Sequence, residues 1–250
     1  MSLSIALITF NEVARLPACL ASVAFADEVV VVDNGSTDGT VELARSLGAR
    51  VLQTPDWPGF GPQKNRAVDM ATGEWVLSID ADEQVTPELR AQILATIAKA
   101  GSDGCVAYNI CRRSSYCGQY MRHSGWYPDR VLRLFRRGHA RFSDHAVHES
   151  LHADGPVGLL EGDLLHQSFA DFESVLDKVN RYSSASAKAL AARGKRGSLG
   201  KALAHGWWAF FRTYVLKRGF LDGQLGLALA ISNAEGTYYR YLKLWLAQRA

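Results

Sequence analysis

Residues 75–85 read WVLSIDADEQV, a short apolar run that is followed at once by Asp80, Asp82 and Glu83. The apolar residues predict a buried β-strand. Three acids directly after such a strand are explained if it ends at an open edge of a sheet, where charge can meet solvent and ligand. The residues around this stretch should therefore contain further strands.

Strand-like and helix-like segments alternate through the first hundred residues. The near-continuous apolar runs that predict strands are 4–10, 28–33, 49–54 and 74–80. The segments with helical patterns are 14–24, 40–47 and 62–71. Strands of this apolar kind are covered on both faces, which is typical of a sheet built from βαβ units. We therefore predict an α/β fold with a mostly parallel central sheet.

Polar residues gather where three of these strands end, which is where parallel sheets bind ligands. They are Thr9, Asn11 and Glu12, then Asp33, then Asp80 and Asp82. Asp33 begins DNGSTDGT, which is also good turn chemistry, so an N-cap or Asx turn is an equal alternative. The spacing of Asp80 and Asp82 is common by chance, but residues two apart in an extended segment can face one cation.

The residue types at this edge indicate the kind of ligand. Carboxylates without a nearby Cys or His favour Mg²⁺ or Mn²⁺ over zinc. Such a cation would neutralise a diphosphate leaving group. The sequence contains neither G-x-G-x-x-G nor G-x-x-x-x-G-K-[ST], so neither a dinucleotide cradle nor a P-loop explains phosphate chemistry here.

Four motifs occur in order along the first half of the chain. They are SIALITFNE (4–12), VVVVDNGSTDGT (29–40), GPQKNRA (61–67) and LSIDADE (77–83). Together they resemble the nucleotide-binding half of glycosyltransferase family 2, whose fold is called GT-A. The resemblance implies an enzyme that transfers a sugar, with inversion, from a nucleotide sugar, using a divalent cation at the D-x-D motif.

The same resemblance implies roles for individual residues. The nucleotide-sugar-binding residues that it implies are Thr9, Asn11, Glu12, Asp33, Lys64 and Asp80. Asp33 is expected at the uracil and Lys64 near the uridine. Asp80 and Asp82 are expected at the ribose and the metal-bound diphosphate, and both are candidate ligands of Mg²⁺ or Mn²⁺.

The second half of the chain resembles one branch of this family. Its motifs are YPDRVLRLFRRGHARFSDHAVHESL (127–151), LLHQSFADFESVLDKVNRYS (164–183) and KRGFLDGQLGLALAISNAEGTYYRYLKL (217–244). They look like the branch that adds glucose to the heptose core of lipopolysaccharide, which implies a UDP-glucose donor and a lipid-linked or core oligosaccharide acceptor. Related polysaccharide enzymes share these motifs, so donor and acceptor stay open.

Two other functions compete with this interpretation. A nucleotidyltransferase that makes a nucleotide sugar uses a similar sheet and metal, but the sequence lacks the Gly-rich, Arg/Lys-bearing loop expected of one. A non-catalytic glycan- or membrane-binding module is the alternative that is not an enzyme.

An inverting transferase needs a base that takes a proton from the acceptor hydroxyl. By analogy with the acidic residue that follows the metal motif in the family, Glu149 is the favoured base, with Asp144 and His148 as alternatives. A structural pair of His148 and Glu149 that caps a loop is the competing interpretation. His166 is a further candidate for the metal or diphosphate, and an interior histidine is an equal alternative.

Five arginines lie close together between residues 130 and 141. Alternation through RVLRLF predicts a strand with Arg130 and some of its neighbours on opposite faces, so the five cannot all serve one site. One or two of them, with Arg130 and Arg133 as candidates, would grip a diphosphate or a phosphorylated acceptor, since guanidinium matches phosphate oxygens. Nucleic-acid binding is not expected, because no recognised motif is present and the N-terminal body is acidic.

Composition limits the architecture and the compartment. The chain has 250 residues, of which 48% are hydrophobic, enough for one large or two small domains. The division expected is a catalytic domain over 1–192, with a nucleotide-sugar half (1–100) and an acceptor half (101–192), and a helical extension over 193–250. Four scattered cysteines and a start without a basic region predict a cytoplasmic protein.

The last quarter of the chain has a different surface. Residues 193–250 contain ten Lys/Arg and two acidic residues, a net charge of +8, together with a tryptophan- and phenylalanine-rich segment around Trp207 and Phe211. This mixture predicts a helix that lies in a membrane interface and holds the protein on the inner face of the cytoplasmic membrane. The alternative is that the aromatic residues pack on the catalytic body or on a second copy of the chain.

Overall fold

The computed structural model describes residues 1–99, 103–143 and 150–249 of the chain. The chain divides into two compact units. Unit 1 comprises Met1–Arg112 and Asp129–His166, and unit 2 comprises Arg113–Pro128 and Gln167–Ala250. Each unit is described here on its own.

Unit 1 contains an α/β sheet with its helices. Its strands are β1 (Leu3–Thr9), β2 (Glu28–Asp33), β3 (Arg50–Gln53), β4 (Trp75–Ser78), β5 (Glu83–Val85), β8 (Asp129–Arg136), β9 (Ala140–Phe142), β10 (Leu151–Ala153) and the first parts of β6 (Ala107–Tyr116) and β11 (Val157–Phe169). Its helices are α1 (Leu16–Ser22), α2 (Thr40–Ser46), α3 (Phe60–Met70) and α4 (Pro87–Ala98). The strands and helices predicted in the first eighty residues are all present.

The main sheet of the described residues has the strand order β3-β2-β1-β4-β8-β6-β11-β5. The first four strands are parallel. From β4 to β8 and from β8 to β6 the pairing is antiparallel, as it is between β11 and β5. The expected mostly parallel sheet is therefore correct for the first half only. The second half connects its strands without the crossover helices that parallel neighbours require.

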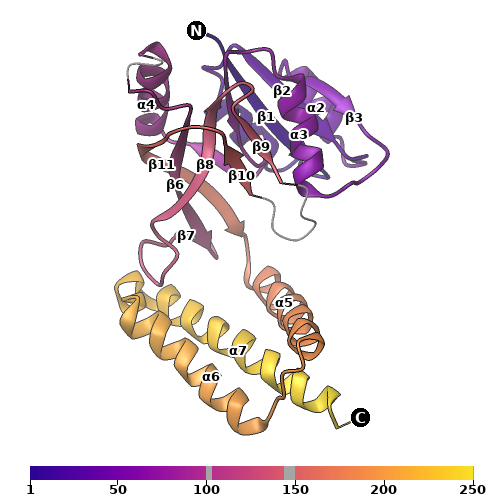
Figure 1. Ribbon diagram of the computed structural model, residues 1–250, viewed down its shortest axis with the longest axis vertical. Helices are drawn as coiled ribbons and strands as arrows, with labels where there is room; N and C mark the ends of the chain where they lie inside the picture. Colours follow the sequence, from indigo (N-terminus) through magenta and orange to yellow (C-terminus); the bar gives the residue numbers. More distant parts are fainter. Residues whose placement is uncertain (100–102, 144–149, 250) are drawn as a thin grey trace. The chain divides into compact units, whose positions relative to one another are not determined.

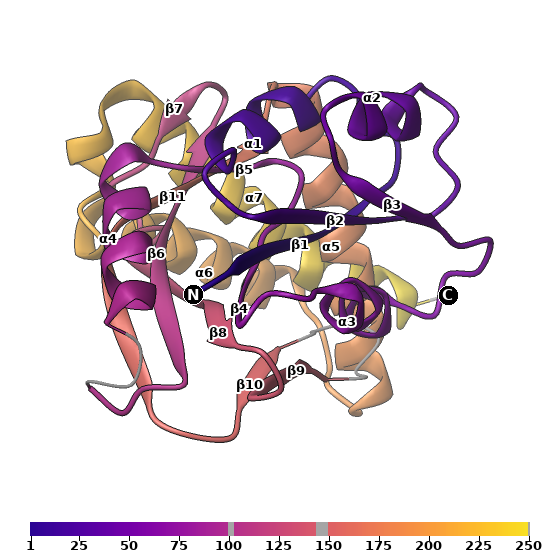
Figure 2. The same cartoon turned by 90° about the horizontal axis from the view of Figure 1, so that it is seen from above.

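The apolar runs are buried on both faces of the sheet, as their composition predicts. Successive residues of β2 point to opposite sides, so Val31 belongs to one apolar cluster and Val30 and Val32 belong to another. The first cluster includes residues of α1, α2 and α4, and the second includes residues of α3. Figure 2 shows α1 and α2 on one side of β1, β2 and β3 and α3 on the other. Covering both faces leaves the strand ends as the accessible part.

Unit 2 is mainly helical (Figure 1). It contains the last parts of β6 and β11, the short strand β7 (Gln119–Tyr120), α5 (Phe172–Ala192), α6 (Leu199–Phe211), a π-helical turn at Arg212–Leu216, a 3₁₀ turn at Gly219–Asp222 and α7 (Gly223–Ala247). The side chains of Asp171 and Ser198 accept hydrogen bonds from the amides of Ser174 and Lys201, at 2.8 and 3.1 Å, and so begin α5 and α6.

The two last helices pack through small residues. Ala202 and Gly206 are buried on α6, and a Cβ added at Gly206 would lie 3.2 Å from the Cβ of Tyr238 on α7. The expected helical C-terminal segment is therefore present. The predicted boundary between residues 192 and 193 lies inside unit 2, at the end of α5, and the division into 1–192 and 193–250 stays a prediction. In the ranges that the structure describes, no helix has the length and hydropathy needed to cross a bilayer.

Candidate active site

The predicted polar residues of β1, β2 and β4 come to one edge of the unit 1 sheet. Thr9 is paired with Asp33 in the parallel register of β1 and β2, and the amide of Ile79 donates to the carbonyl of Ala6 at 3.2 Å. The carboxyl ends of the three strands are thus side by side. Asp80 follows Ile79 directly, which places it on the same edge.

Asp33 is fully buried and is held by four hydrogen bonds from its own surroundings. The amides of Gly35 and Ser36 each donate to its Oδ1 at 2.9 Å. The hydroxyl of Thr9 donates to Oδ2 at 2.9 Å, and the hydroxyl of Ser36 donates to the same oxygen. A carboxylate has about four lone-pair positions, so this arrangement uses them all. Asp33 therefore forms the Asx turn that the sequence allowed, and it fixes the loop that begins there.

The loops after β1 and β2 are interlocked. The amide of Asn11 donates to the hydroxyl of Ser36 at 2.8 Å, and the amide of Thr37 donates to the side-chain oxygen of Asn11 at 2.9 Å. The amide of Glu12 donates to the hydroxyl of Thr40 at 2.9 Å. These mutual bonds hold the expected nucleotide-pocket residues Asn11 and Glu12 on a defined rim.

Glu12 is half-buried on this rim. Burial raises the pKa of Glu12 above its ordinary value, and Asp82 adds to the shift, while Arg15 opposes it through an ion pair at 3.3 Å. An acid whose charged form is disfavoured in the free protein is suited to a position that a cation or a hydroxyl group approaches.

Asp80 lies in a cluster of paired charges. Its Oδ1 is 2.8 Å from Nζ of Lys64, and its Oδ2 is 2.7 Å from a guanidinium nitrogen of Arg133. Burial alone would raise the pKa of Asp80, but Arg133 and Lys64 hold the pKa of this carboxyl well below its ordinary range. Asp80 is therefore ionised, and each of its oxygens faces a cation.

Glu83 completes this cluster and was not among the predicted site residues. It is 0% exposed, its Oε1 lies 2.7 Å from Arg133, and its Oε2 accepts the amide of Asp80 at 3.0 Å. Burial alone would lower the pKa of the Arg133 guanidinium, but Asp80 and Glu83 raise it. We call Lys64, Asp80, Glu83 and Arg133 the charged cluster. The signal in the sequence was the third acid of the opening stretch, three residues after Asp80.

Asp82 and His166 meet beside the charged cluster. In the antiparallel pair of β11 and β5, His166 is opposite Glu83, and its Nε2 lies 3.4 Å from Oδ2 of Asp82. Both side chains are partly exposed. His166, the further candidate for the metal or diphosphate, therefore lies next to Asp82, and its role as a ligand stays a prediction.

Asp82 and His166 would supply only part of the ligands that a divalent cation needs. Among the described residues, no group of three or more His, Cys, Asp or Glu side chains is placed to hold a metal ion. Magnesium is commonly held by one or two carboxylates together with substrate phosphates and water. Asp82 fits that partial role, with the imidazole of His166 beside it. Asp80 fits it less well, because both of its oxygens are in ion pairs.

The chain next to the candidate bases is described only up to residue 143 and from residue 150. Asp144, His148 and Glu149 lie outside the described residues. The two strands on either side of them, β9 and β10, pair antiparallel, and Asn65 on α3 exchanges two hydrogen bonds of 3.0 Å with the backbone of Phe142. Phe142 is thus bonded to α3 at Asn65, the residue that follows Lys64.

Arg130 and Arg133 have different surroundings. Arg133 is 5% exposed within the charged cluster, whereas Arg130 is exposed. Three residues apart on β8, they point to opposite faces. The structure pairs Arg133 with Asp80 and Glu83, whereas Arg130 is exposed on the other face of β8.

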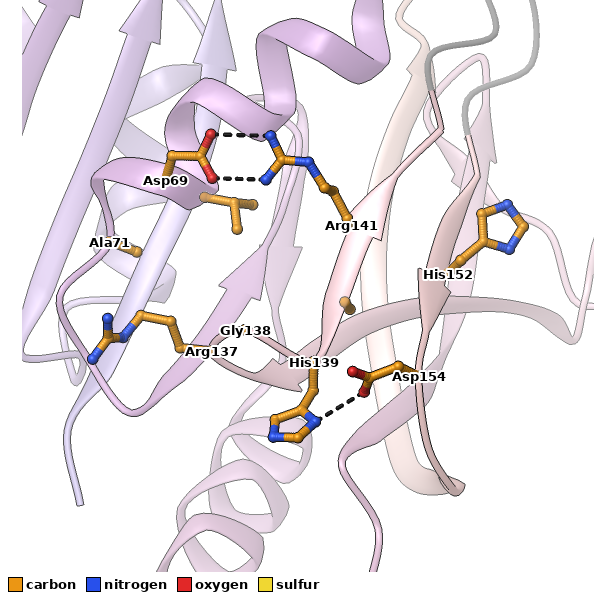
Figure 3. Close-up of a pocket in the computed structure, with 10 residues that line it drawn as sticks. Asp69, Ala71, Arg137, Gly138, His139, Arg141, His152 and Asp154 are labelled. Carbon is orange, nitrogen blue, oxygen red and sulfur yellow. Dashed lines mark hydrogen bonds and ion pairs between the residues drawn. The ribbon is translucent and has the colours of Figure 1, made fainter.

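A cavity of about 330 Å³ lies elsewhere in unit 1 (Figure 3). Its charged side chains are largely paired with each other: Arg141 with Asp69, and His139 with Asp154 at 2.8 Å. Arg137, which also lines it, donates to the carbonyl of Gly73, just before β4 begins. The cavity is therefore at the opposite end of β4 from Asp80, and it contains none of the predicted site residues.

Known proteins resemble this chain in sequence and in fold. The model of glycosyl transferase family 2 matches residues 4–151. An uncharacterized glycosyltransferase of Rickettsia typhi is 34% identical over 248 residues, which cover 95% of this chain and 85% of the relative. The lipopolysaccharide core biosynthesis glycosyltransferase LpsC of Rhizobium meliloti is 32% identical over 260 residues, covering 96% and 93%.

A solved structure shows a similar fold at low identity. The structure of S. aureus TarS 1–349 in complex with UDP is 18% identical, with a TM-score of 0.50, and covers 100% of this chain and 91% of that chain. At this identity the similarity concerns the fold alone.

Proposed function

The chain belongs to glycosyl transferase family 2, and on this premise we propose that it transfers a hexose, with inversion, from a UDP-sugar to a lipopolysaccharide core or related cell-envelope glycan. Its fold is GT-A, and it is a glycosyltransferase. The family match favours this activity over nucleotidyl transfer and over a non-catalytic module. UDP-glucose is the proposed donor.

One observation carries the proposal. At the carboxyl ends of the parallel strands, Asp80 is fixed between Lys64 and Arg133, while Asp82 and His166 lie 3.4 Å apart beside it. A site for a sugar diphosphate needs cationic groups for the leaving phosphates and a rigid support for them. In the charged cluster, Lys64 is the candidate cation for these phosphates, and Asp80, held by Arg133, orients it.

The residues of the rim are proposed to hold the nucleoside. Thr9 ends β1 and bonds to Asp33, while Asn11 and Glu12 lie on a loop that is interlocked with 34–40, so the pocket is formed before the donor binds. Because four donors already bond to Asp33, it would accept a uracil N–H only if one of them left. Asp33 otherwise acts by positioning the loop.

A divalent cation, Mg²⁺ or Mn²⁺, is proposed at Asp82 and His166. When bound, it would supply charge stabilisation for the diphosphate leaving group. The ammonium group of Lys64 lies 2.8 Å from Oδ1 of Asp80. From there Lys64 would bind an anionic oxygen of the donor. Arg133 would keep Asp80 ionised and in place.

Glu149 is proposed as the base that takes the acceptor proton, with Asp144 and His148 as the alternatives. The test is a comparison of Glu149→Gln with the unchanged protein, measuring UDP release from UDP-glucose with a purified lipid A-core acceptor and, separately, UDP binding. We expect transfer to fall by ~100-fold or more while UDP binding changes by a few fold, because the amide keeps the shape but not the proton affinity.

Other results would redirect the proposal. Loss of UDP binding together with transfer assigns Glu149 to the donor side. Equal loss in Asp144→Asn, with activity kept in Glu149→Gln, moves the base to Asp144. UTP formation from UDP-glucose and pyrophosphate, without transfer, would replace the proposal by nucleotidyl transfer.

We propose that the enzyme works on the inner face of the cytoplasmic membrane as a peripheral protein, where a lipid-linked acceptor is available. The net charge of +8 in residues 193–250 supports this location. Self-association through the same residues is the competing proposal.

A further inference from the structure

Large apolar side chains are exposed where α6 joins α7. We call residues 207–231 the hairpin tip. Eight of its large apolar side chains are each at least 38% exposed, namely Trp207, Trp208, Val215, Leu216, Phe220, Leu221, Leu227 and Ile231. Apolar surface concentrated in this way is unusual on a protein that faces water alone, and it marks a contact with another protein or with lipid.

The close approach of α6 and α7 depends on small residues and not on these exposed side chains. The two helices approach through Ala202 and Gly206 on α6, and a Cβ at Gly226 of α7 would meet the carbonyl of Gly219. The ring of Trp207 stacks on Phe211 with centroids 5.5 Å apart, which holds it beside α6. The exposed residues therefore form an ordered surface on elements whose cores are already complete.

The charge on the hairpin tip is of one sign. Arg212, Lys217 and Arg218 are exposed. The stretch contains one acid, Asp222, which is 7% exposed and turned inward, where it accepts hydrogen bonds from the amides of Arg122 and His123 and from the hydroxyl of Ser124.

These bonds bring a second basic segment to the tip. The amide of Ser124 donates to the carbonyl of Lys217 at 2.9 Å, so the loop 122–125 lies against the turn that joins the helices. Exposed Arg122 thereby adds to the basic residues of the tip. The buried position of Asp222 removes the one negative charge that would offset them at the surface.

We propose that the hairpin tip inserts its apolar side chains into the interface of an anionic phospholipid bilayer, while Arg122, Lys217 and Arg218 bind the headgroup phosphates. This extends the proposed peripheral location, because it assigns the contact to one end of one helical pair. The combination of aromatic rings and cations suits headgroup depth. A second copy of the chain fits the surface less well, because the same positive charges would face each other.

The experiment compares two double variants of the full chain that remove the same charges. Lys217→Gln with Arg218→Gln changes the tip, and Lys195→Gln with Arg196→Gln changes the connection between α5 and α6. Each is sedimented with vesicles of phosphatidylglycerol and phosphatidylcholine, without donor or acceptor. Each Lys or Arg near an anionic surface is worth roughly fivefold in binding. We expect the tip variant to bind at least tenfold more weakly and the other variant to stay within about threefold.

A third variant tests the apolar part. Phe220→Ser with Leu221→Ser should reduce vesicle binding at low salt, with an unchanged far-UV circular dichroism spectrum and unchanged UDP release from UDP-glucose in solution. Equal losses in the two charge variants would overturn the proposal, since they indicate attraction by net charge alone. The tip would be assigned to a second copy if the unchanged protein is a dimer that does not sediment with vesicles and this variant is a monomer. Because no donor is needed for sedimentation, failure here leaves the proposed transferase activity untouched.

Discussion

The charged cluster of unit 1 buries charged side chains, and the hairpin tip of unit 2 exposes apolar ones. Both arrangements cost free energy unless a partner is present. In the charged cluster, Glu83 is buried with its charge, and Arg133 of the same unit pairs with it at 2.7 Å. In the hairpin tip, Trp207 stacks on Phe211 but is still 64% exposed. A buried charge has its partner within the fold, whereas an exposed apolar surface indicates a partner outside it.

Replacing Arg133 should have the largest effect on the free energy of unfolding. In Arg133→Met, Asp80 and Glu83 lose their shared buried cation, and breaking a buried pair from one side costs about 3–5 kcal/mol. We expect the free energy of unfolding, measured by urea denaturation, to fall by about that amount. Arg130→Met is the matched control on the same strand, and since Arg130 is exposed it should change stability by no more than about 0.5 kcal/mol. Similar losses in both would show that Arg133 is not a structural cation.

Asp82 gives a test of activity and not of stability. Unlike Asp80 and Glu83, it forms no described ion pair with Arg133. We expect Asp82→Asn to lower turnover by at least ~100-fold, about 2.7 kcal/mol of transition-state stabilisation, with little change in unfolding. Steady-state UDP release checks it. Asp69→Asn, at the cavity in Figure 3, is the control and should keep full activity. Activity that persists in EDTA would contradict a cation at Asp82.

The pH dependence of stability tests whether Asp80 is held ionised. Its pKa is lowered in the folded state, so its contribution is present above the unfolded value of about 4 and is lost as the pH falls toward the folded value. Between pH 4 and 3, the unfolded chain binds up to one proton more than the folded protein at Asp80. Asp80→Asn should therefore lower the slope of the unfolding free energy against pH by up to about 1.4 kcal/mol per pH unit. Unfolding free energies of both proteins across pH 3–7 measure it. Parallel curves would show that the carboxyl is not perturbed.

The smallest effect is expected at the exposed surface of α6. Leu203 is 58% exposed, so Leu203→Ala should change the free energy of unfolding by no more than about 0.5 kcal/mol. Leu229 on α7 is 2% exposed, and Leu229→Ala should cost about 2–5 kcal/mol. Thermal and urea unfolding of both variants gives the comparison. A large loss at Leu203 would mean that the outer surface of α6 belongs to the core.

The sequence was a good guide where the structure depends on neighbours along the chain. The apolar runs of β1, β2 and β4 and the polar residues that follow them could be read directly, since period and turn chemistry are local properties. The antiparallel strands β6 and β11 were not identified, because their sequences alternate less clearly and their pairing joins distant residues. The bases proposed at 144–149 lie outside the described residues and stay predictions.

Partners distant in sequence were the part that could not be predicted. Arg133 was expected to grip phosphate, and the structure places it between Asp80 and Glu83, which precede it by 53 and 50 residues. A sequence gives the charges but not which of them meet. Glu83 was passed over because an acid after a strand resembles a solvated one, and only the fold shows that it is buried.

The interlocked loops after β1 and β2 have a consequence for the order of events during synthesis. Their hydrogen bonds join residues 24 to 28 positions apart, from Thr9 with Asp33 to Glu12 with Thr40. Short loops close at low entropic cost, and the N-terminal part of a chain leaves the ribosome first. We expect the rim to assemble while the C-terminal half is still being translated. Glu83, in contrast, cannot be buried at low cost until residue 133 has emerged, so the charged cluster forms only after its arginine has been translated.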